Sequence, residues 1–127
     1  MAQPEGLRFS KSHEWVRVEG DTATVGITQH AADELGDIAL VLPPEVGRVL
    51  KAGEPFGEIE SLKAVSDLYA PVGGTVAAVN DALPDAPERV NDDPYGDGWI
   101  IKIRMSDPAE LSALLDAAAY DALIGEA

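Results

Sequence analysis

The sequence has no cysteine among its 127 residues. It can therefore form no disulfide, and it has no thiol for nucleophilic or redox chemistry. Any sulfur chemistry performed with this protein would have to come from a group attached to it. The cysteine count gives no sign of an oxidising compartment.

Basic residues are also scarce, because nine lysines and arginines stand against 23 aspartates and glutamates, for a formal net charge of −14. A nucleic-acid partner is not expected, since binding needs clustered positive charge to neutralise phosphates. Anionic membrane surfaces are disfavoured for the same reason. Most of the acids are expected to form a solvated surface, which would steer the protein toward basic patches on its partners.

Long hydrophobic runs are absent, and none approaches the roughly 20 residues that span a bilayer. The segment Met1–Gly6 lacks the basic and apolar regions of a signal peptide and the arginine-rich character of a transit peptide. We therefore expect a cytoplasmic bacterial protein. The mature form of an organellar protein is the alternative.

The sequence also contains no recognisable group of catalytic or metal-binding residues. His13 and His30 lie far apart, and no histidine or cysteine cluster has the spacing of zinc ligands. The acidic loop Asp92–Asp97 does not follow the EF-hand register, and there is no phosphate-binding loop or serine elbow. His13 is expected to be a strand-edge residue. The sequence thus predicts a protein that is not itself an enzyme.

Short runs of β-forming residues alternate with turn residues, which favours one antiparallel sandwich or barrel domain. Thr28 can cap a short helix that Gly36 terminates. The continuous apolar run 38–42 predicts a buried strand. The expected elements are strands at 14–19, 22–28, 38–42, 56–61, 65–69, 74–79 and 99–105, a helix at 29–35, and a long ordered loop at 80–98.

The two ends of the chain differ from this β pattern. Residues 1–6 are expected to fray. Residues 107–124 predict one amphipathic helix, with Asp107, Pro108 and Glu110 forming its capping box. Its sheet-facing side would consist of apolar residues at helical spacing, namely Leu111, Leu114, Leu115, Ala118 and Ala122.

Lys63 occupies a special position, at the tip of a predicted hairpin between the strands at 56–61 and 65–69. A side chain at such a tip is accessible and is not needed for packing. Taken alone, the position is best explained as a solvated turn lysine. The neighbouring residues change that interpretation.

These neighbours read Glu60-Ser61-Leu62-Lys63-Ala64, followed by Ser66-Asp67 and then by Pro71-Val72-Gly73-Gly74. The pattern resembles the lipoyl-attachment region of the glycine cleavage system H protein family. Further segments match the family in the same order and spacing: His13–Val18, Val25–Thr28, Leu35–Ile38 and Asn91–Trp99. The resemblance extends over roughly residues 7 to 124, nearly the whole chain.

The resemblance implies a barrel-sandwich hybrid of the lipoyl-domain type, monomeric, with short flanking helices and a C-terminal helix. It implies that Lys63 carries lipoate through an amide bond. Glu60 and Asp67 would guide the lipoate-attaching enzyme. Ser12, Glu14 and Asp67 would hold the loaded arm in a surface cleft, as partly exposed contacts to its cationic amine.

The resemblance also implies a set of partners. The arm would accept an aminomethyl group at a pyridoxal-phosphate glycine decarboxylase and pass its carbon to tetrahydrofolate at an aminomethyltransferase. Dihydrolipoyl dehydrogenase would then reoxidise the dithiol. Two alternatives stay open: a lipoyl domain of a 2-oxo acid dehydrogenase, and an acidic interaction module whose Lys63 is never modified. A biotin carrier is disfavoured, because Leu62 and Ala64 stand where such carriers usually have methionines.

The sequence departs from the family's usual pattern in three places. Leu62 replaces valine, which is a conservative change. Leu42-Pro43 stands where many members have Glu-Leu. Glu34 stands where some members carry histidine, so the sequence leaves its role toward the arm open.

Overall fold

The computed structural model describes residues 6–125 of the chain. Its strands are β1 (Arg8–Phe9), β2 (Glu14–Glu19), β3 (Thr22–Ile27), β4 (Ile38–Leu42), β5 (Val49–Leu50), β6 (Pro55–Ser61), β7 (Val65–Tyr69), β8 (Gly74–Val79) and β9 (Ile101–Met105). Its helical segments are α1 (Gln29–Leu35), α2 (Arg89–Asp92), a 3₁₀ helix (Pro108–Ala113) and α3 (Ala117–Leu123).

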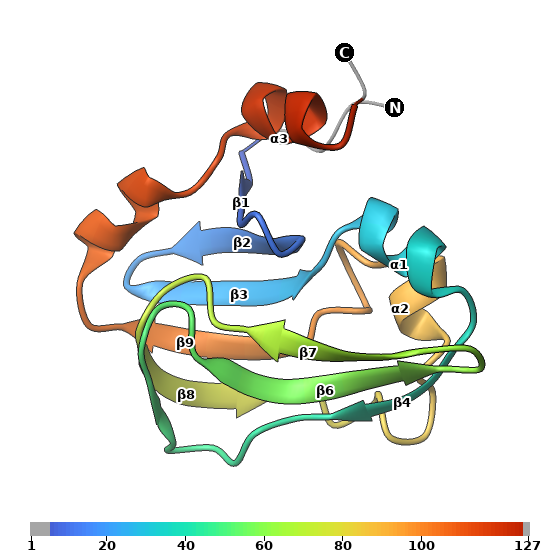
Figure 1. Cartoon of the computed structure of the whole chain (residues 1–127). Helices are drawn as coiled ribbons and strands as arrows, with labels where there is room; N and C mark the ends of the chain where they lie inside the picture. The colour runs from blue at the N-terminus through green and yellow to red at the C-terminus, as the bar shows by residue number, and fades with distance from the viewer. Residues whose placement is uncertain (1–5, 126–127) are drawn as a thin grey trace.

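The strands form two antiparallel sheets (Figure 1). The larger sheet has the order β1-β2-β3-β9-β8-β5, and the smaller one has the order β4-β6-β7. Figure 1 shows the β6–β7 hairpin reaching out on the side of the molecule where α1 and α2 lie. The predicted fold class, mainly β with two small sheets and short flanking helices, is confirmed.

Residues from both sheets form one buried apolar cluster, which is the main core. The larger sheet contributes Val25, Val76 and Ile103, and the smaller sheet contributes Ile59 and Leu68. Alternate residues of β3 and β9 point to this core, because successive side chains of a strand face opposite sides. Each fully buried aliphatic side chain stabilises the fold by about 1.5–3 kcal/mol relative to exposure.

The strand predicted at 38–42 is present as β4, but it is buried on one face only. Ile38 and Val41 are buried, whereas Leu40 is 38% exposed and Leu42 is 42% exposed. β4 lies at the edge of the smaller sheet, whose inner face packs on the core. A continuous apolar run therefore did not mean burial on both faces.

The short helix α1 begins and ends as its sequence predicts. The Thr28 hydroxyl accepts a hydrogen bond from the Ala31 N–H, 3.2 Å away. Gly36 ends the helix with a left-handed φ of 83°, and its N–H donates to the Ala32 carbonyl. Side chains other than glycine rarely adopt that φ, which is why glycine suits this position.

The C-terminal segment does not form the single helix predicted for residues 107–124. The 3₁₀ helix ends at Ala113, the chain runs extended through Leu115, and α3 begins after Asp116. Leu115 is held in a bridge to Phe9 by two backbone hydrogen bonds of 2.7 and 2.8 Å. This pairing with β1 interrupts the helix.

The caps around the interruption differ in part from the prediction. Asp107 caps the 3₁₀ helix as expected, and Asp116 caps α3 by accepting from the Ala119 N–H. Glu110 does not close a capping box, because its carboxylate accepts the Gly73 N–H at 2.9 Å. Of the predicted helix face, Ala118 and Ala122 are exposed.

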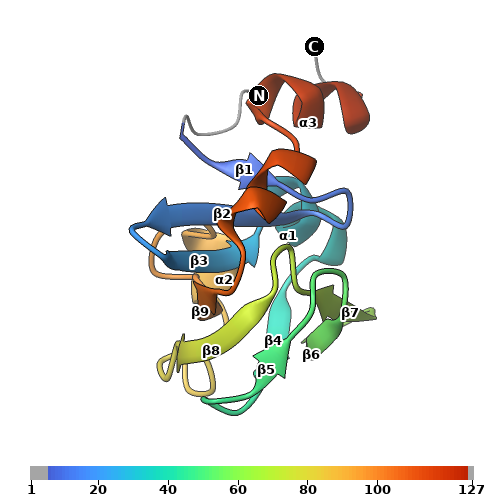
Figure 2. The same cartoon turned by 90° about the vertical axis from the view of Figure 1, so that its left-hand side faces the viewer.

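α3 instead covers a second, smaller core formed by Leu7, Phe9, Trp15 and Tyr120. Figure 2 shows α3 lying above β1, at the end of the molecule opposite β4 and β5. Of the predicted frayed end, Gly6 is exposed in a turn, and residues 1–5 lie outside the described residues.

Candidate functional site

Lys63 lies in the turn that joins β6 to β7, and it is exposed. Ser61 closes this turn: its N–H donates to the Ala64 carbonyl at 2.8 Å, and its hydroxyl accepts from the N–H groups of Lys63 and Ala64 at 3.3 and 3.1 Å. Serine forms such local side-chain to backbone bonds readily. The turn therefore has a defined shape, and it presents the lysine outward.

The tip of the hairpin is also attached to the segment between α1 and β4. The Leu62 N–H donates to the Asp37 carbonyl at 3.1 Å. Asn91, in α2, holds that segment from the other side: its Oδ1 accepts the Ile38 N–H at 2.9 Å, and its Nδ2 donates to the Gly36 carbonyl at 2.8 Å. Asn91 thus supports the base on which the tip rests.

The side chain of Lys63 leans over the end of α1. A Cβ placed on Gly36 would lie 3.5 Å from Lys63 Cε, which is an ordinary van der Waals distance. Within residues 6–125 the Lys63 ammonium forms no ion pair or side-chain hydrogen bond, so it is free for modification.

Beside α1 lies a cleft of about 300 Å³. Its apolar lining comes from Ile27, Ala31, Leu35, Ile59 and Leu68. Its polar lining comes from Ser12, His13, Glu14, His30, Glu34, Ser66 and Asp67. Three of these are carboxylates, and none of the described residues that line the cleft is lysine or arginine.

The three residues predicted to hold an arm, Ser12, Glu14 and Asp67, all line this cleft. Ser12 and Asp67 are exposed, but Glu14 is not, being only 1% exposed. The prediction of a partly exposed Glu14 was wrong. Glu14 is the first residue of β2, and it is buried together with the next two residues, Trp15 and Val16.

Glu14 is well satisfied in its buried position. The hydroxyls of Ser10 and Ser12 donate to its Oε1 at 2.6 and 2.5 Å, and the Tyr69 N–H donates to its Oε2 at 3.3 Å. Burial raises the pKa of the Glu14 carboxyl above its usual range, and these hydrogen bonds oppose the rise. A carboxylate offers about four lone-pair positions, so one position at Oε2 is left for a further donor.

Glu60, predicted to guide a modifying enzyme, does not belong to the cleft. It is half-buried and lies beside Leu40 and Val65 in the register of the smaller sheet. Its neighbour Ile59 points into the core, so Glu60 faces the outer side of that sheet. The register places Asp67 opposite Glu58, on the same face of the sheet as Glu60, so Asp67 lies between the outer face and the cleft, whereas Glu60 does not line the cleft.

The two histidines, which the sequence gave no reason to connect, meet in the cleft. Their ring centroids are 5.1 Å apart. His30 Nε2 lies 3.8 Å from Glu34 Oε1, and His13 Nδ1 lies 2.7 Å from the Tyr120 hydroxyl. Burial and the neighbouring His30 lower the pKa of His13, and Glu34 opposes that change.

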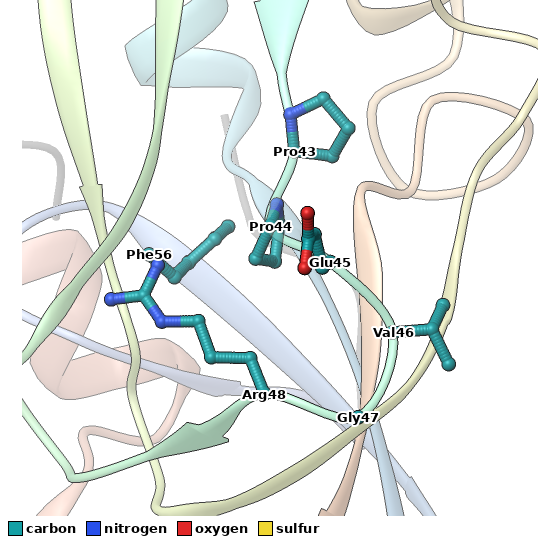
Figure 3. Close-up of a pocket in the computed structure, with 7 residues that line it drawn as sticks. All are labelled: Pro43, Pro44, Glu45, Val46, Gly47, Arg48 and Phe56. Carbon is teal, nitrogen blue, oxygen red and sulfur yellow. The ribbon is translucent and has the colours of Figure 1, made fainter.

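A wider hollow of about 700 Å³ lies at the other end of β6 (Figure 3). Figure 3 shows the Arg48 side chain extending toward Phe56, and Val46 pointing away from the other labelled side chains. Arg48 is already engaged with the Pro55 carbonyl at 3.2 Å. The hollow contains none of the predicted site residues, and Phe56 and Lys63 lie near opposite ends of the strand.

Comparison with known proteins agrees with this geometry. Residues 7–127 match the family described as Glycine cleavage H-protein. The chain belongs to this family. No helix among residues 6–125 is long and apolar enough to cross a membrane.

Two relatives named Glycine cleavage system H protein illustrate the similarity. The protein of Chromohalobacter salexigens is 59% identical over 122 residues, which cover 95% of this chain and 93% of the relative. The protein of Symbiobacterium thermophilum is 58% identical over 123 residues, which cover 97% of this chain and 96% of the relative. A crystal structure of a glycine cleavage system H protein from Mycobacterium marinum superimposes with a TM-score of 0.89 at 40% identity, covering 97% of this chain and 99% of that one.

Proposed function

We propose that this chain is the lipoylated shuttle of the glycine cleavage system, with lipoate attached to Lys63. The observation that carries the proposal is the exposed, unpaired lysine on a fixed turn, whose stem leans over α1 beside an acidic cleft. The names of the relatives support the same function. The protein would act as a non-catalytic, monomeric carrier in the cytoplasm.

The residues around Lys63 suit a long tethered group. The apolar lining of the cleft, including Leu35 and Ile59, can cover an alkyl chain, and its polar residues can hold a polar end. When bound, lipoate supplies a dithiolane that can be reduced and can carry an aminomethyl group. Its partners would be a glycine decarboxylase, an aminomethyltransferase, dihydrolipoyl dehydrogenase and a lipoate-attaching enzyme.

The contribution of the chain itself is position. Ser61 and Asn91 fix the turn to which the arm would be attached. The arm would therefore extend from a point that keeps its position on the protein. A tethered group meets each partner at a high effective concentration, without a diffusive search. Such a carrier needs no catalytic residue of its own.

The cleft would shelter the cargo between partners. The loaded arm ends in a primary amine, which is cationic near neutral pH, and Glu14, Glu34 and Asp67 make the cleft negative. Ser12 and Asp67 stand at its exposed surface, and Glu14 acts from its buried floor. Charge-assisted hydrogen bonds between ammonium and carboxylate are stronger than neutral ones.

Glu60 and Asp67 are the residues we expect the lipoate-attaching enzyme to recognise. Both lie on the strands that carry the tip, and Asp67 is exposed. The enzyme would approach the outer side of the smaller sheet, where Glu60 lies beside exposed apolar residues such as Leu40 and Val65. Asp67 would thus serve both the enzyme and the cleft.

The test is expression in a lipoate-replete host, followed by intact-mass measurement and peptide mapping. We expect one lipoyl group, on Lys63, and none on Lys63→Arg. The purified protein should then accept the aminomethyl group from glycine and a glycine decarboxylase. A 2-oxo acid dehydrogenase domain would be lipoylated but not loaded, and a simple interaction module would not be modified at all.

A further inference from the structure

His13 is held in a backbone conformation that non-glycine residues seldom adopt. Its φ is 73°, in the left-handed region. Its N–H donates to the Ser10 carbonyl at 3.1 Å, and its carbonyl accepts the Thr28 N–H at 3.0 Å. Sparsely populated conformations persist where the surroundings over-determine them, and they concentrate at functional sites. His13 lines the cleft, so its conformation bears on that site.

The third constraint on His13 comes from the far end of the chain. Tyr120, in α3, is fully buried, and its hydroxyl lies 2.7 Å from both His13 Nδ1 and Thr28 Oγ1. Its ring stacks on Phe9, with centroids 4.8 Å apart. α3 therefore reaches the cleft through one buried hydroxyl.

The direction of each hydrogen bond in this group follows from the one hydrogen that each hydroxyl, of Thr28 and of Tyr120, has to donate. Burial raises the pKa of Tyr120 to about 12, so its hydroxyl keeps one hydrogen to donate. Thr28 Oγ1 already accepts the Ala31 N–H, and its own buried hydrogen needs an acceptor. The arrangement that satisfies every group has Thr28 donating to Tyr120, and Tyr120 donating to His13 Nδ1.

We propose that this hydroxyl chain, Thr28 to Tyr120 to His13, keeps the His13 imidazole uncharged and so preserves the negative cleft that receives the cationic end of the arm. Tyr120 is then a positioning residue, which acts through His13. A donor aimed at Nδ1 favours the neutral ring, because the protonated ring carries a hydrogen there and cannot accept. The last step of this inference rests on the proposed function.

The other titratable groups around His13 act in both directions: the carboxylates of the cleft favour a protonated imidazole, and His30 disfavours it. Glu14 in β2, Glu34 in α1 and Asp67 in β7 are the acids of the cleft, and a protonated His13 would cancel part of their charge. His30 in α1 disfavours that protonation, and Glu34 favours it. In α3, Asp121 acts on Tyr120 and helps it to keep its hydrogen.

The first test uses the unmodified protein, so it does not depend on lipoate. Tyr120→Phe removes the hydroxyl and keeps the ring that stacks on Phe9. An NMR titration of the two histidines should show a higher His13 pKa in Tyr120→Phe than in the parent. Thr28→Ser retains the hydroxyl chain and should leave the His13 pKa unchanged.

Tyr95→Phe is a matched control, because it removes a hydroxyl that accepts the Gln29 N–H at 2.9 Å and is not one of the three groups of the hydroxyl chain. It too should leave the His13 pKa at the parent value. An unchanged or lower His13 pKa in Tyr120→Phe would overturn the proposal, since a merely structural hydroxyl predicts no rise.

The second test measures ammonia release from the lipoylated, aminomethyl-loaded protein after separation from its partners. Tyr120→Phe should release ammonia several-fold faster than the parent, and the ratio should grow as the pH falls toward the range where His13 becomes protonated. A ratio of one at every pH would overturn the role of His13 in the cleft. If Lys63 carries no lipoate, the proposed function fails, whereas the titration of the unmodified protein still decides the hydroxyl chain.

Discussion

Asn91→Ala should weaken the base of the hairpin tip more than it weakens the fold as a whole. The substitution removes the bonds to the Ile38 N–H and the Gly36 carbonyl, of 2.9 and 2.8 Å. Each intramolecular hydrogen bond contributes about 0.5–1.5 kcal/mol net, so the loss should be about 1–3 kcal/mol. The segment that accepts the Leu62 N–H would then lose its support, and the tip would sample more conformations.

Two measurements separate these effects. Urea unfolding gives the change in the free energy of unfolding, and the rate of lipoylation of Lys63 reports the shape of the tip. Asn91→Asp is an informative partner, because it can still accept from Ile38 but can no longer donate to Gly36. It should give an intermediate loss of stability.

Asn80→Ala is the matched control. Asn80 also uses its amide on the backbone, donating to the carbonyls of Asp97 and Trp99 at 2.8 Å each, away from the hairpin. It should lose at least as much stability as Asn91→Ala, yet lipoylation should proceed at the parent rate at a temperature where all variants are folded. Equal lipoylation rates for Asn91→Ala and the parent would refute the role of Asn91 as a support of the tip.

Three further predictions concern the site itself. Lys63→Arg should keep the free energy of unfolding within about 0.5 kcal/mol of the parent and carry no lipoate; a lipoyl group mapped to another lysine contradicts the assignment. Glu60→Gln should slow lipoylation in a timed mass assay while changing stability by no more than about 0.5 kcal/mol, and equal rates would remove its role in recognition. Glu14→Gln tests the buried carboxyl, whose pKa is raised above its ordinary value of 4.5 mainly by burial. A raised folded-state pKa gives stability that is present below the unfolded pKa and lost as the pH rises through the folded one. The stability of the parent minus that of Glu14→Gln should therefore fall across this window in urea titrations between about pH 4 and pH 7, and a constant difference would show that Glu14 does not titrate this way.

The exposed turn that carries Lys63 could be predicted from sequence because local chemistry defines it. Ser61 closes the turn with hydrogen bonds to residues two and three positions away. Thr28 and Gly36 cap the two ends of α1, and each bonds to a residue three or four positions away. Such interactions depend on neighbours in the chain, which a single sequence displays directly. The predicted strands at 65–69 and 74–79 have the observed bounds for the same reason.

The C-terminal helix was mispredicted because the decisive contact is distant in sequence. Leu111, Leu114 and Leu115 have helical spacing, and the local pattern favours a helix through all of them. The bridge between Phe9 and Leu115 overrides that pattern with two backbone hydrogen bonds. Helix propensity is a weak preference, and tertiary pairing of this kind readily outweighs it.

The surroundings of Glu14 and His13 could not be predicted from sequence for the same physical reason. Glu14 begins a strand, and from the sequence its carboxylate would be expected at the surface. In the structure the Ser10 and Ser12 hydroxyls and the Tyr69 N–H donate hydrogen bonds to that buried carboxylate. His13 owes its environment to Tyr120, 107 residues further along the chain. An exposed lysine needs only a turn to present it, whereas a buried acid beside a neutral imidazole needs several distant segments to fold around it at once. The fold is therefore required less to display Lys63 than to set the charge of the cleft into which its arm would return.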